Sequence, residues 1–166
     1  MVTFRVIKHQ KCILISQQEW MNQAMTAAEH AGACDEVPVG AVIVEKNTHR
    51  MIAKGFNLRG SHQDPTAHAE MLAIKNASKA LKTWRLTDCI LVVTLEPCPM
   101  CLAAAQQARV CEVIYGAKDP KGGALSLGYS LHEDKRTNHR FPVTFHNDPK
   151  CSEILSEFFK KKRQKK

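Results

Sequence analysis

The spacing of apolar residues along the chain changes several times between a helical period and a strand period. Apolar side chains recur every three or four residues after Ser16, around Met71 and around Phe158, and this pattern predicts amphipathic helices. The run Cys89–Leu95 is continuously apolar, as is typical of a strand buried on both faces. The predicted elements, in chain order, are helix 17–33, strands 37–44 and 51–56, helix 67–82, strand 89–95, helix 99–109, strand 111–115, strand 142–146 and helix 149–163.

Capping and turn residues predict where several of these elements begin. Ser16 and Glu19 form a capping-box pattern, which predicts a helix start at Ser16. Pro99 and Pro149 stand at predicted first helical positions, where proline is favoured. Residues 116–140 are rich in glycine and charge and are expected to form an irregular loop, with a short helix near 125–131. The polar stretch 45–50 predicts the turn of an antiparallel hairpin.

Strands alternate with helices after the hairpin, so the sequence predicts two crossover units and a mixed or mostly parallel sheet sandwiched by helices. A chain of 166 residues is expected to form one domain. No apolar run approaches the roughly 20 residues that span a bilayer, and residues 12–15 are too short for the core of a signal peptide. The expectation is a soluble, cytoplasmic protein without a membrane segment.

Positive charge is concentrated at the two ends of the chain. The formal net charge is +8, and the last seven residues hold six cations, among them Lys160, Lys161, Lys162 and Arg163. This distribution favours a polyanionic partner, although a solvated, solubilising tail is the equally simple interpretation. Charge alone leaves both open.

Two predicted helix starts carry side chains that bind metals. His68 precedes one helix, and Cys98 and Cys101 lie three residues apart at the start of another. The other five of the seven cysteines are expected to act as small buried hydrophobes. A helix N-terminus favours thiolates, and two thiolates with one imidazole suit zinc and leave a fourth position open, as in catalytic sites. Zinc bound there would activate a water molecule.

Glu70 lies two residues after His68, where its carboxylate could take a proton from that water and deliver it to the substrate nitrogen and the leaving group. A histidine and a glutamate at this spacing indicate little alone, and a Cys-x-x-Cys pair fits metal, redox chemistry or coincidence. Together they form the H-x-E…P-C-x-x-C signature of zinc-dependent base deaminases.

At these residues the chain resembles the bacterial TadA-type tRNA adenosine deaminases, within the cytidine-deaminase-like superfamily. The resemblance covers roughly residues 16–163 and extends well beyond the zinc motif. The matching segments are 36–42 (EVPVGAV), 55–57 (GFN), 62–70 (HQDPTAHAE), 94–101 (TLEPCPMC), 113–119 (VIYGAKD), 138–140 (NHR) and 155–159 (LSEFF).

The resemblance implies a three-layer α/β/α cytidine-deaminase-like fold with a mixed sheet of about five strands. It implies one zinc ion per subunit on His68, Cys98 and Cys101, with Glu70 as the proton shuttle. The implied reaction is hydrolytic deamination of the wobble adenosine of an arginine tRNA to inosine by a homodimer. The residues that the resemblance assigns to the substrate are Asn57, Lys118 and Asp119, and those it assigns to the anticodon stem-loop are Lys160, Lys161, Lys162 and Arg163.

Several interpretations stay open on the sequence. Asn57 could satisfy a loop, Asp119 could be an ordinary turn residue, and the apolar pattern favours Phe158 and Phe159 as core residues over base-stacking ones. The alternative activity is deamination of guanine or another free nucleobase or nucleotide, because such relatives share the metal motif. A third alternative is a catalytically dead RNA-binding subunit, against which Glu70 argues. The expected organisation is an N-terminal extension of unknown role (1–15), a zinc-dependent deaminase domain (16–163) and a basic tail (164–166).

Overall fold

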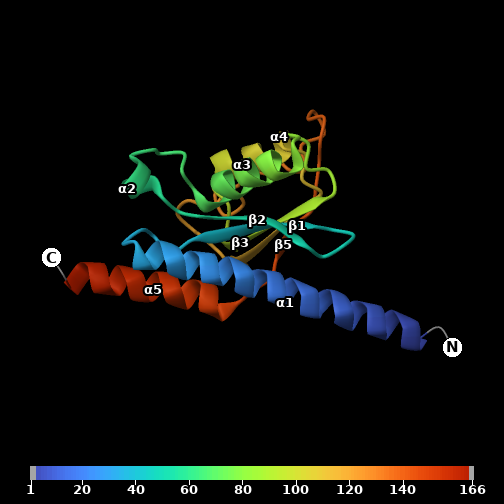
Figure 1. The fold of residues 1–166 in the computed structure, drawn as a ribbon, viewed down its shortest axis with the longest axis horizontal. Helices are drawn as coiled ribbons and strands as arrows, with labels where there is room; N and C mark the ends of the chain where they lie inside the picture. Colours follow the sequence, from blue (N-terminus) through green and yellow to red (C-terminus); the bar gives the residue numbers. More distant parts are fainter. Residues whose placement is uncertain (1–2, 165–166) are drawn as a thin grey trace.

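A five-stranded sheet forms the centre of the molecule (Figure 1). The computed structural model describes the backbone of residues 3–164 and the side chains of residues 17–164. The strands are β1 (Gly40–Glu45), β2 (Met51–Phe56), β3 (Cys89–Leu95), β4 (Glu112–Ala117) and β5 (Val143–Phe145), in the spatial order β2-β1-β3-β4-β5. β1 is antiparallel to both of its neighbours, whereas β3, β4 and β5 are mutually parallel. The predicted mixed sheet of five strands is confirmed.

Helices cover both faces of this sheet. They are α1 (Thr3–Ala33), α2 (Arg59–His62), α3 (Ala69–Leu81), α4 (Pro99–Gln107) and α5 (Pro149–Gln164). α1 and α5 lie side by side on one face, and α3 and α4 cover the other (Figure 1). The predicted three-layer α/β/α arrangement is therefore confirmed.

Two hydrophobic clusters hold the layers together, one on each face of the sheet. Val42 and Val92 face the helices α1 and α5, whereas the adjacent Ile43 and Leu91 face α3 and α4. All four side chains are fully buried, which explains why strand β3 lacks the polar alternation of a half-exposed strand. The predicted burial of β3 on both faces is confirmed.

Two glycines let helices approach the sheet closely next to the functional end. A Cβ atom on Gly40 would lie 2.1 Å from the carbonyl oxygen of Ala24 in α1, and one on Gly55 would lie 2.3 Å from that of Ala69 in α3. No larger residue fits at either position without moving a helix backbone. The contact at Gly55 fixes the first turn of α3 against the end of β2, and this turn carries Glu70.

Some element boundaries differ from the sequence prediction. α1 begins at Thr3, so the predicted helix start at Ser16 is wrong. The preceding residues contain no glycine or proline that would end a helix, and the capping-box pattern at Ser16 falls within it. β1 begins at Gly40 and not at residue 37, and the four-residue α2 was not predicted.

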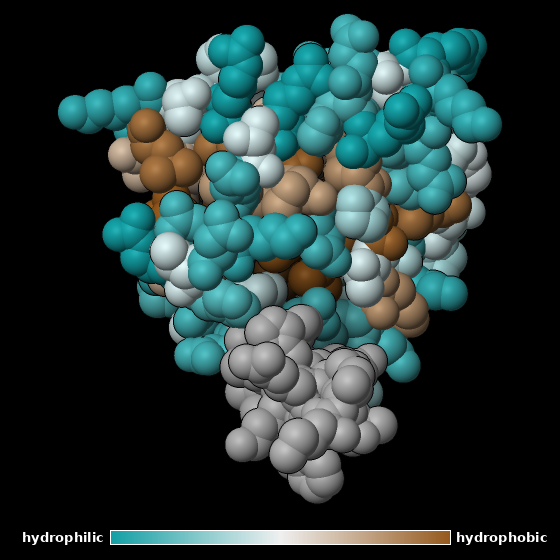
Figure 2. All heavy atoms as spheres, turned by 90° about the vertical axis from the view of Figure 1, so that its right-hand side faces the viewer, coloured by the Kyte–Doolittle hydropathy of each residue, from teal (hydrophilic) through white to brown (hydrophobic). Residues whose placement is uncertain are grey.

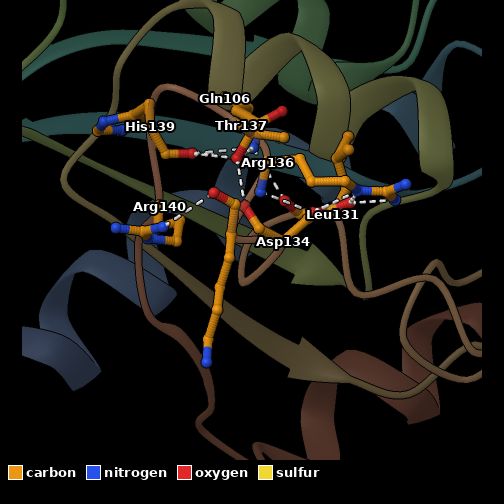
Figure 3. A network of polar contacts seen from close by, with 8 residues as sticks. Gln106, Leu131, Asp134, Arg136, Thr137, His139 and Arg140 are labelled. Atoms are coloured by element: carbon orange, nitrogen blue, oxygen red, sulfur yellow. Dashed lines mark hydrogen bonds and ion pairs between the residues drawn. The ribbon is translucent and has the colours of Figure 1, made fainter.

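The long segment between β4 and β5 forms turns, and the helix predicted near residues 125–131 is absent from it. Buried acceptors and donors of the sheet and α4 hold this segment in place instead. The side-chain amide of Gln106 in α4 donates to the carbonyls of Leu131 and His139 and to the hydroxyl of Thr137, at 2.9, 2.9 and 3.1 Å (Figure 3). Within the predicted helix range the backbone forms turns, among them the hydrogen bonds from the N–H groups of Gly128 and Tyr129 to the carbonyls of Leu125 and Ala124, at 2.9 and 2.8 Å.

The two ends of the sheet present different surfaces. The end with the β1–β2 turn carries mainly hydrophilic side chains, with apolar ones in the recesses between them (Figure 2). The other end, where α2 and the end of α5 lie, holds the cavity described below. Among the helices of the described chain, none has the length and hydropathy needed to cross a membrane.

Candidate active site

The three predicted metal ligands lie at two helix starts that the sheet brings together. β2 and β3 are both antiparallel to β1, so they run in the same direction, and the helices that follow them begin at the same edge. His68 and Cys98 occupy equivalent positions, each with extended backbone just before the first residue of α3 or α4. Their carbonyl oxygens accept the hydrogen bonds of Leu72 and Leu102, which begin the two helical ladders.

The distances between the donor atoms match a tetrahedral zinc site. His68 Nδ1 lies 3.7 Å from Cys98 Sγ and 3.6 Å from Cys101 Sγ, and all three donor atoms lie within 4.8 Å of one another. Zn–N and Zn–S bonds of about 2.1 and 2.3 Å at a tetrahedral angle place nitrogen and sulfur about 3.6 Å apart. The donor set therefore fits zinc, and three protein ligands leave one position for a water molecule.

Hydrogen bonding within the ligand set prepares the sulfur atoms for a metal. A hydrogen bond from the Cys101 thiol, supported by His68, lowers the pKa of Cys98 to about 4, although burial acts in the opposite sense. The hydrogen bond to the Cys98 thiolate, together with burial, raises the pKa of Cys101. The same thiolate raises the pKa of His68. The hydrogen bonds within the ligand set thus favour the thiolate form of Cys98, which is the form that binds zinc.

Glu70 occupies the first turn of α3, next to the metal ligands and almost out of contact with solvent. Its side chain is 4% exposed, and burial raises the pKa of its carboxyl group above the ordinary value, against the opposing effect of the His68 charge. A raised pKa makes the carboxylate form a better proton acceptor than an ordinary glutamate, and the positioned group can then pass that proton on. This is the property that the predicted proton shuttle requires.

A cavity of about 710 Å³ opens above the ligands and Glu70. Two further predicted residues, Lys118 and Asp119, line it at the end of β4, and Asn57 lines it at the end of β2. Glu96, which stands next to Pro97 and could be structural on the sequence alone, also lines the cavity. The sequence analysis did not single out the remaining polar lining residues, which are Arg59, Lys121 and Ser156.

Asn57 forms hydrogen bonds with a loop, one of the two roles that the sequence left open, and it also lines the cavity. Its side chain is 6% exposed, and its amide donates a hydrogen bond of 3.3 Å to the carbonyl of Val37. Its backbone N–H donates to the carbonyl of Val39 at 3.0 Å. The side chain is therefore oriented by the segment before β1, and its amide oxygen and second N–H are not used by that hydrogen bond.

Comparison with known proteins agrees with this geometry. The sequence profile of the cytidine and deoxycytidylate deaminase zinc-binding region matches residues 14–117. A tRNA-specific adenosine deaminase of Bacillus subtilis (strain 168) is 45% identical over 148 residues, which cover 89% of this chain and 91% of the relative. The chain belongs to the tRNA-specific adenosine deaminases of this zinc-dependent family.

Solved structures of two activities resemble this deaminase. A structure from studies of A-to-I editing by tRNA:A34 deaminases is 39% identical, with a TM-score of 0.74, and covers 85% of this chain and 99% of its own. A guanine deaminase from Bacillus subtilis is 33% identical, with a TM-score of 0.59, over 88% of this chain and 93% of its own. The zinc site of the family is formed here by His68, Cys98 and Cys101.

The C-terminal helix of this deaminase contributes to the cavity wall, which corrects one prediction. Phe159 is 45% exposed and lines the cavity together with Leu155, so it is not a core residue. Phe158 is half-buried and belongs to neither hydrophobic cluster, so it is not a core residue either, and Lys162 Nζ lies 5.5 Å from the centre of its ring. The helical period could not separate these neighbours, because both fall near the edge of the apolar stripe.

The four predicted RNA-binding cations differ in their surroundings. Arg163 lines the cavity, and Lys160 and Lys161 are exposed. Lys162 forms an ion pair of 2.6 Å with Asp35 at the end of α1. The C-terminal helix thus carries cations from the cavity rim outwards, and one of them also ties α5 to α1.

Proposed function

We propose that this deaminase hydrolyses the wobble adenosine of an arginine tRNA anticodon to inosine and releases ammonia. The observation that carries the proposal is the position of the zinc ligands and Glu70 at the base of a cavity whose rim bears cations. The similarity to tRNA-specific adenosine deaminases supports the same substrate.

The cavity brings a nucleophile and an acid–base group to one place. The chemistry that zinc supplies in a site with one open position is the activation of a water molecule near neutral pH. The Glu70 carboxylate accepts one proton of the attacking water and delivers it to the ring nitrogen of the purine. It then takes the second proton from the hydroxyl group that the water has added to the carbon and delivers it to the amine, which leaves as ammonia. Because Glu70 is 4% exposed, bulk water does not compete for that proton.

In this proposal Asn57 orients the base. Its side-chain amide donates to the Val37 carbonyl and the residue lines the cavity, so the amide oxygen and the second N–H remain for a base bound there. A fixed amide can pair with a donor and an acceptor on the edge of a purine, and this holds the amino-bearing carbon over the reactive water.

The rim favours a polynucleotide over a free base. Arg59, Lys118, Lys121 and Arg163 come from three different segments and all line the cavity. A flipped base brings its flanking phosphates to such a rim, whereas a free purine offers no anion for these cations to bind. This distribution supports the tRNA substrate over the guanine deaminase alternative, for which the 33% identical structure is the supporting observation.

A homodimer completes the proposal. Leu127 and Tyr129 follow the cavity rim and are 49% and 55% exposed, and neighbouring α4 presents half-buried Met100, Ala103 and Ala104. Exposed apolar side chains in one region are typical of an interface. Light scattering after size-exclusion chromatography tests this: twice the chain mass is expected, and a monomer mass at micromolar concentration would contradict it.

The test of the activity is a parallel incubation of the zinc-loaded protein with an arginine tRNA transcript, free guanine and free cytidine. We expect inosine in the tRNA and no deamination of the other two. Xanthine from guanine with an unmodified tRNA would replace the proposal with its alternative. A catalytically dead RNA-binding subunit would leave all three substrates unchanged.

A further inference from the structure

Glu96 stands between the zinc site and the cavity rim without belonging to the ligand set. It follows the last residue of β3 and precedes Pro97 and Cys98. Its side chain is 3% exposed, and its backbone N–H donates to the carbonyl of Ala117 at the end of β4, at 2.8 Å. A buried carboxylate at this place needs partners.

The carboxylate of Glu96 receives three hydrogen bonds from one loop, residues 118–126, which we call the rim loop. Oε2 accepts the backbone N–H of Asp119 at 3.1 Å and the hydroxyl of Ser126 at 2.6 Å. Oε1 accepts the backbone N–H of Ser126 at 2.7 Å. All partners are donors, so the position suits an acceptor with two oxygen atoms.

The rim loop is also pressed against the same segment. A Cβ atom on Gly123 would lie 2.3 Å from Cδ of Glu96, and the backbone N–H of Ala124 donates to the carbonyl of Pro97 at 2.8 Å. Both ends of the loop are therefore held by the two residues that immediately precede the zinc ligand Cys98.

Three side chains of the rim loop line the cavity, those of Lys118, Asp119 and Lys121, and the supports of Asp119 and Lys118 differ. Asp119 is tied to Glu96 through its own backbone, and its Oδ1 accepts the N–H groups of Lys121 and Gly122 at 3.1 Å each. Lys118 Nζ instead lies 5.3 Å from the ring centre of Phe145. Loss of the Glu96 carboxylate should therefore displace Asp119 far more than Lys118.

We propose that Glu96 is a positioning residue that fixes Asp119 and the rim loop relative to the zinc ligand Cys98. This proposal rests on the proposed function, since it concerns how the tRNA substrate is seated. Glu96 acts through Asp119 and not through zinc. The segment Glu96–Cys98 thereby fixes the position of the zinc site relative to the part of the rim that receives the nucleotide.

Glu96→Gln is the variant that removes this link with the smallest change of shape. The Gln oxygen can keep the Ser126 N–H, and the rotatable Ser126 hydroxyl can turn to accept from the new amide. The Asp119 N–H then faces a donor and loses its acceptor. We expect KM for an anticodon stem-loop to rise about tenfold while kcat changes less than about threefold and zinc content stays at one per chain.

A double-mutant cycle separates positioning from a general loss of stability. With Asp119→Ala, the effect of Glu96→Gln on kcat/KM should largely vanish, because the side chain that it positions is gone. When Glu96→Gln is combined with Asn57→Ser instead, the effects of the two substitutions on the free energy derived from kcat/KM should add. Glu112→Gln is the matched control: this carboxylate accepts one hydrogen bond, from Thr144, at the other end of β4, and its loss should leave both kinetic constants unchanged.

Each outcome bears on the proposal. Additive effects of Glu96→Gln and Asp119→Ala would overturn it, as would a loss of zinc that parallels the loss of activity. Unchanged kinetic constants in Glu96→Gln would overturn it as well. The wild-type protein is assayed first. If it forms no inosine in the stem-loop, the proposed function fails, independently of the role of Glu96.

Discussion

Helix α4 has buried polar side chains at both of its ends, and the two ends satisfy them differently. At its start, the sulfur atoms of Cys98 and Cys101 converge on His68 Nδ1, within 3.7 Å. At its other end, the Gln106 amide donates to three acceptors of the segment 131–139 (Figure 3). The sulfur and nitrogen atoms at the start of α4 face one another. The amide at its other end is instead paired with two backbone carbonyls and one hydroxyl.

This difference distinguishes polar side chains that form a functional site from polar side chains that only stabilise the fold. The converging set has the distances of a metal site and opens on a cavity. The Gln106 network joins α4 to a long segment without secondary structure and ties down its carbonyl groups. A substitution at the start of α4 should abolish deamination. A substitution at its other end should lower only the free energy of unfolding.

Removing one zinc ligand should have the largest effect. We expect Cys98→Ala to lose bound zinc and to lower inosine formation at least about a thousandfold, because the activated water depends on the metal. Zinc analysis and a tRNA deamination assay measure both. Cys34→Ala is the control and should keep full zinc and activity. Cys34 is exposed, so the expectation that it is a buried hydrophobe is wrong. Zinc retained at one per chain in Cys98→Ala would refute the ligand assignment.

Removing the amide at the other end of α4 should unfold the protein more easily and leave the chemistry intact. Gln106→Ala leaves buried acceptors without their donor, so we expect the free energy of unfolding to fall by about 2–3 kcal/mol. Urea denaturation measures this. Zinc content and kcat should match wild type at temperatures where the variant is folded, and a loss of zinc would show that the two ends are not independent.

Deleting residues 160–166 should weaken RNA binding by about tenfold and flatten its dependence on salt, because fewer phosphates are neutralised. Filter binding of an anticodon stem-loop at several salt concentrations checks this. Arg163→Gln alone is the informative companion, since Arg163 lines the cavity. An unchanged salt slope in the deletion would leave the tail with a solubilising role only.

Glu36 should give the smallest effect, and one that depends on pH. Burial opposes its ionisation, but hydrogen bonds from Ser61 and Gly60 outweigh this and hold the pKa of Glu36 below its ordinary value of 4.5. The carboxylate therefore stabilises the fold above pH 4.5, and this contribution is lost as pH falls through the lowered pKa.

Urea denaturation of wild type and Glu36→Gln measures this contribution. We expect wild type to be more stable by about 1 kcal/mol at neutral pH. The gap should shrink on acidification below the ordinary carboxyl pKa. A gap that widens in acid would mean that the protonated form is the one stabilised.

The sequence predicted the sheet and the zinc ligands because both depend on local patterns. β2 and β3 have their predicted bounds, and His68, Cys98 and Cys101 meet as their helix starts required. The start of α1 was mispredicted because a capping pattern does not end a helix whose preceding residues can also be helical.

The rest of the site depends on contacts between distant segments. Arg59, Lys121 and Ser156 come from three segments that only the fold assembles, and no spacing in the sequence marks them. Glu96 stands next to the zinc motif, and that adjacency was the one available signal. Its partners Asp119 and Ser126 follow it by 23 and 30 residues.

The most direct test of the central claim compares wild type with Glu70→Ala on an arginine tRNA transcript, with inosine at the wobble position and bound zinc measured on the same samples. Glu70→Ala should retain about one zinc per chain and lose at least about a hundredfold in rate, the range of a general acid–base group. Inosine formation at the wild-type rate in Glu70→Ala would contradict the account.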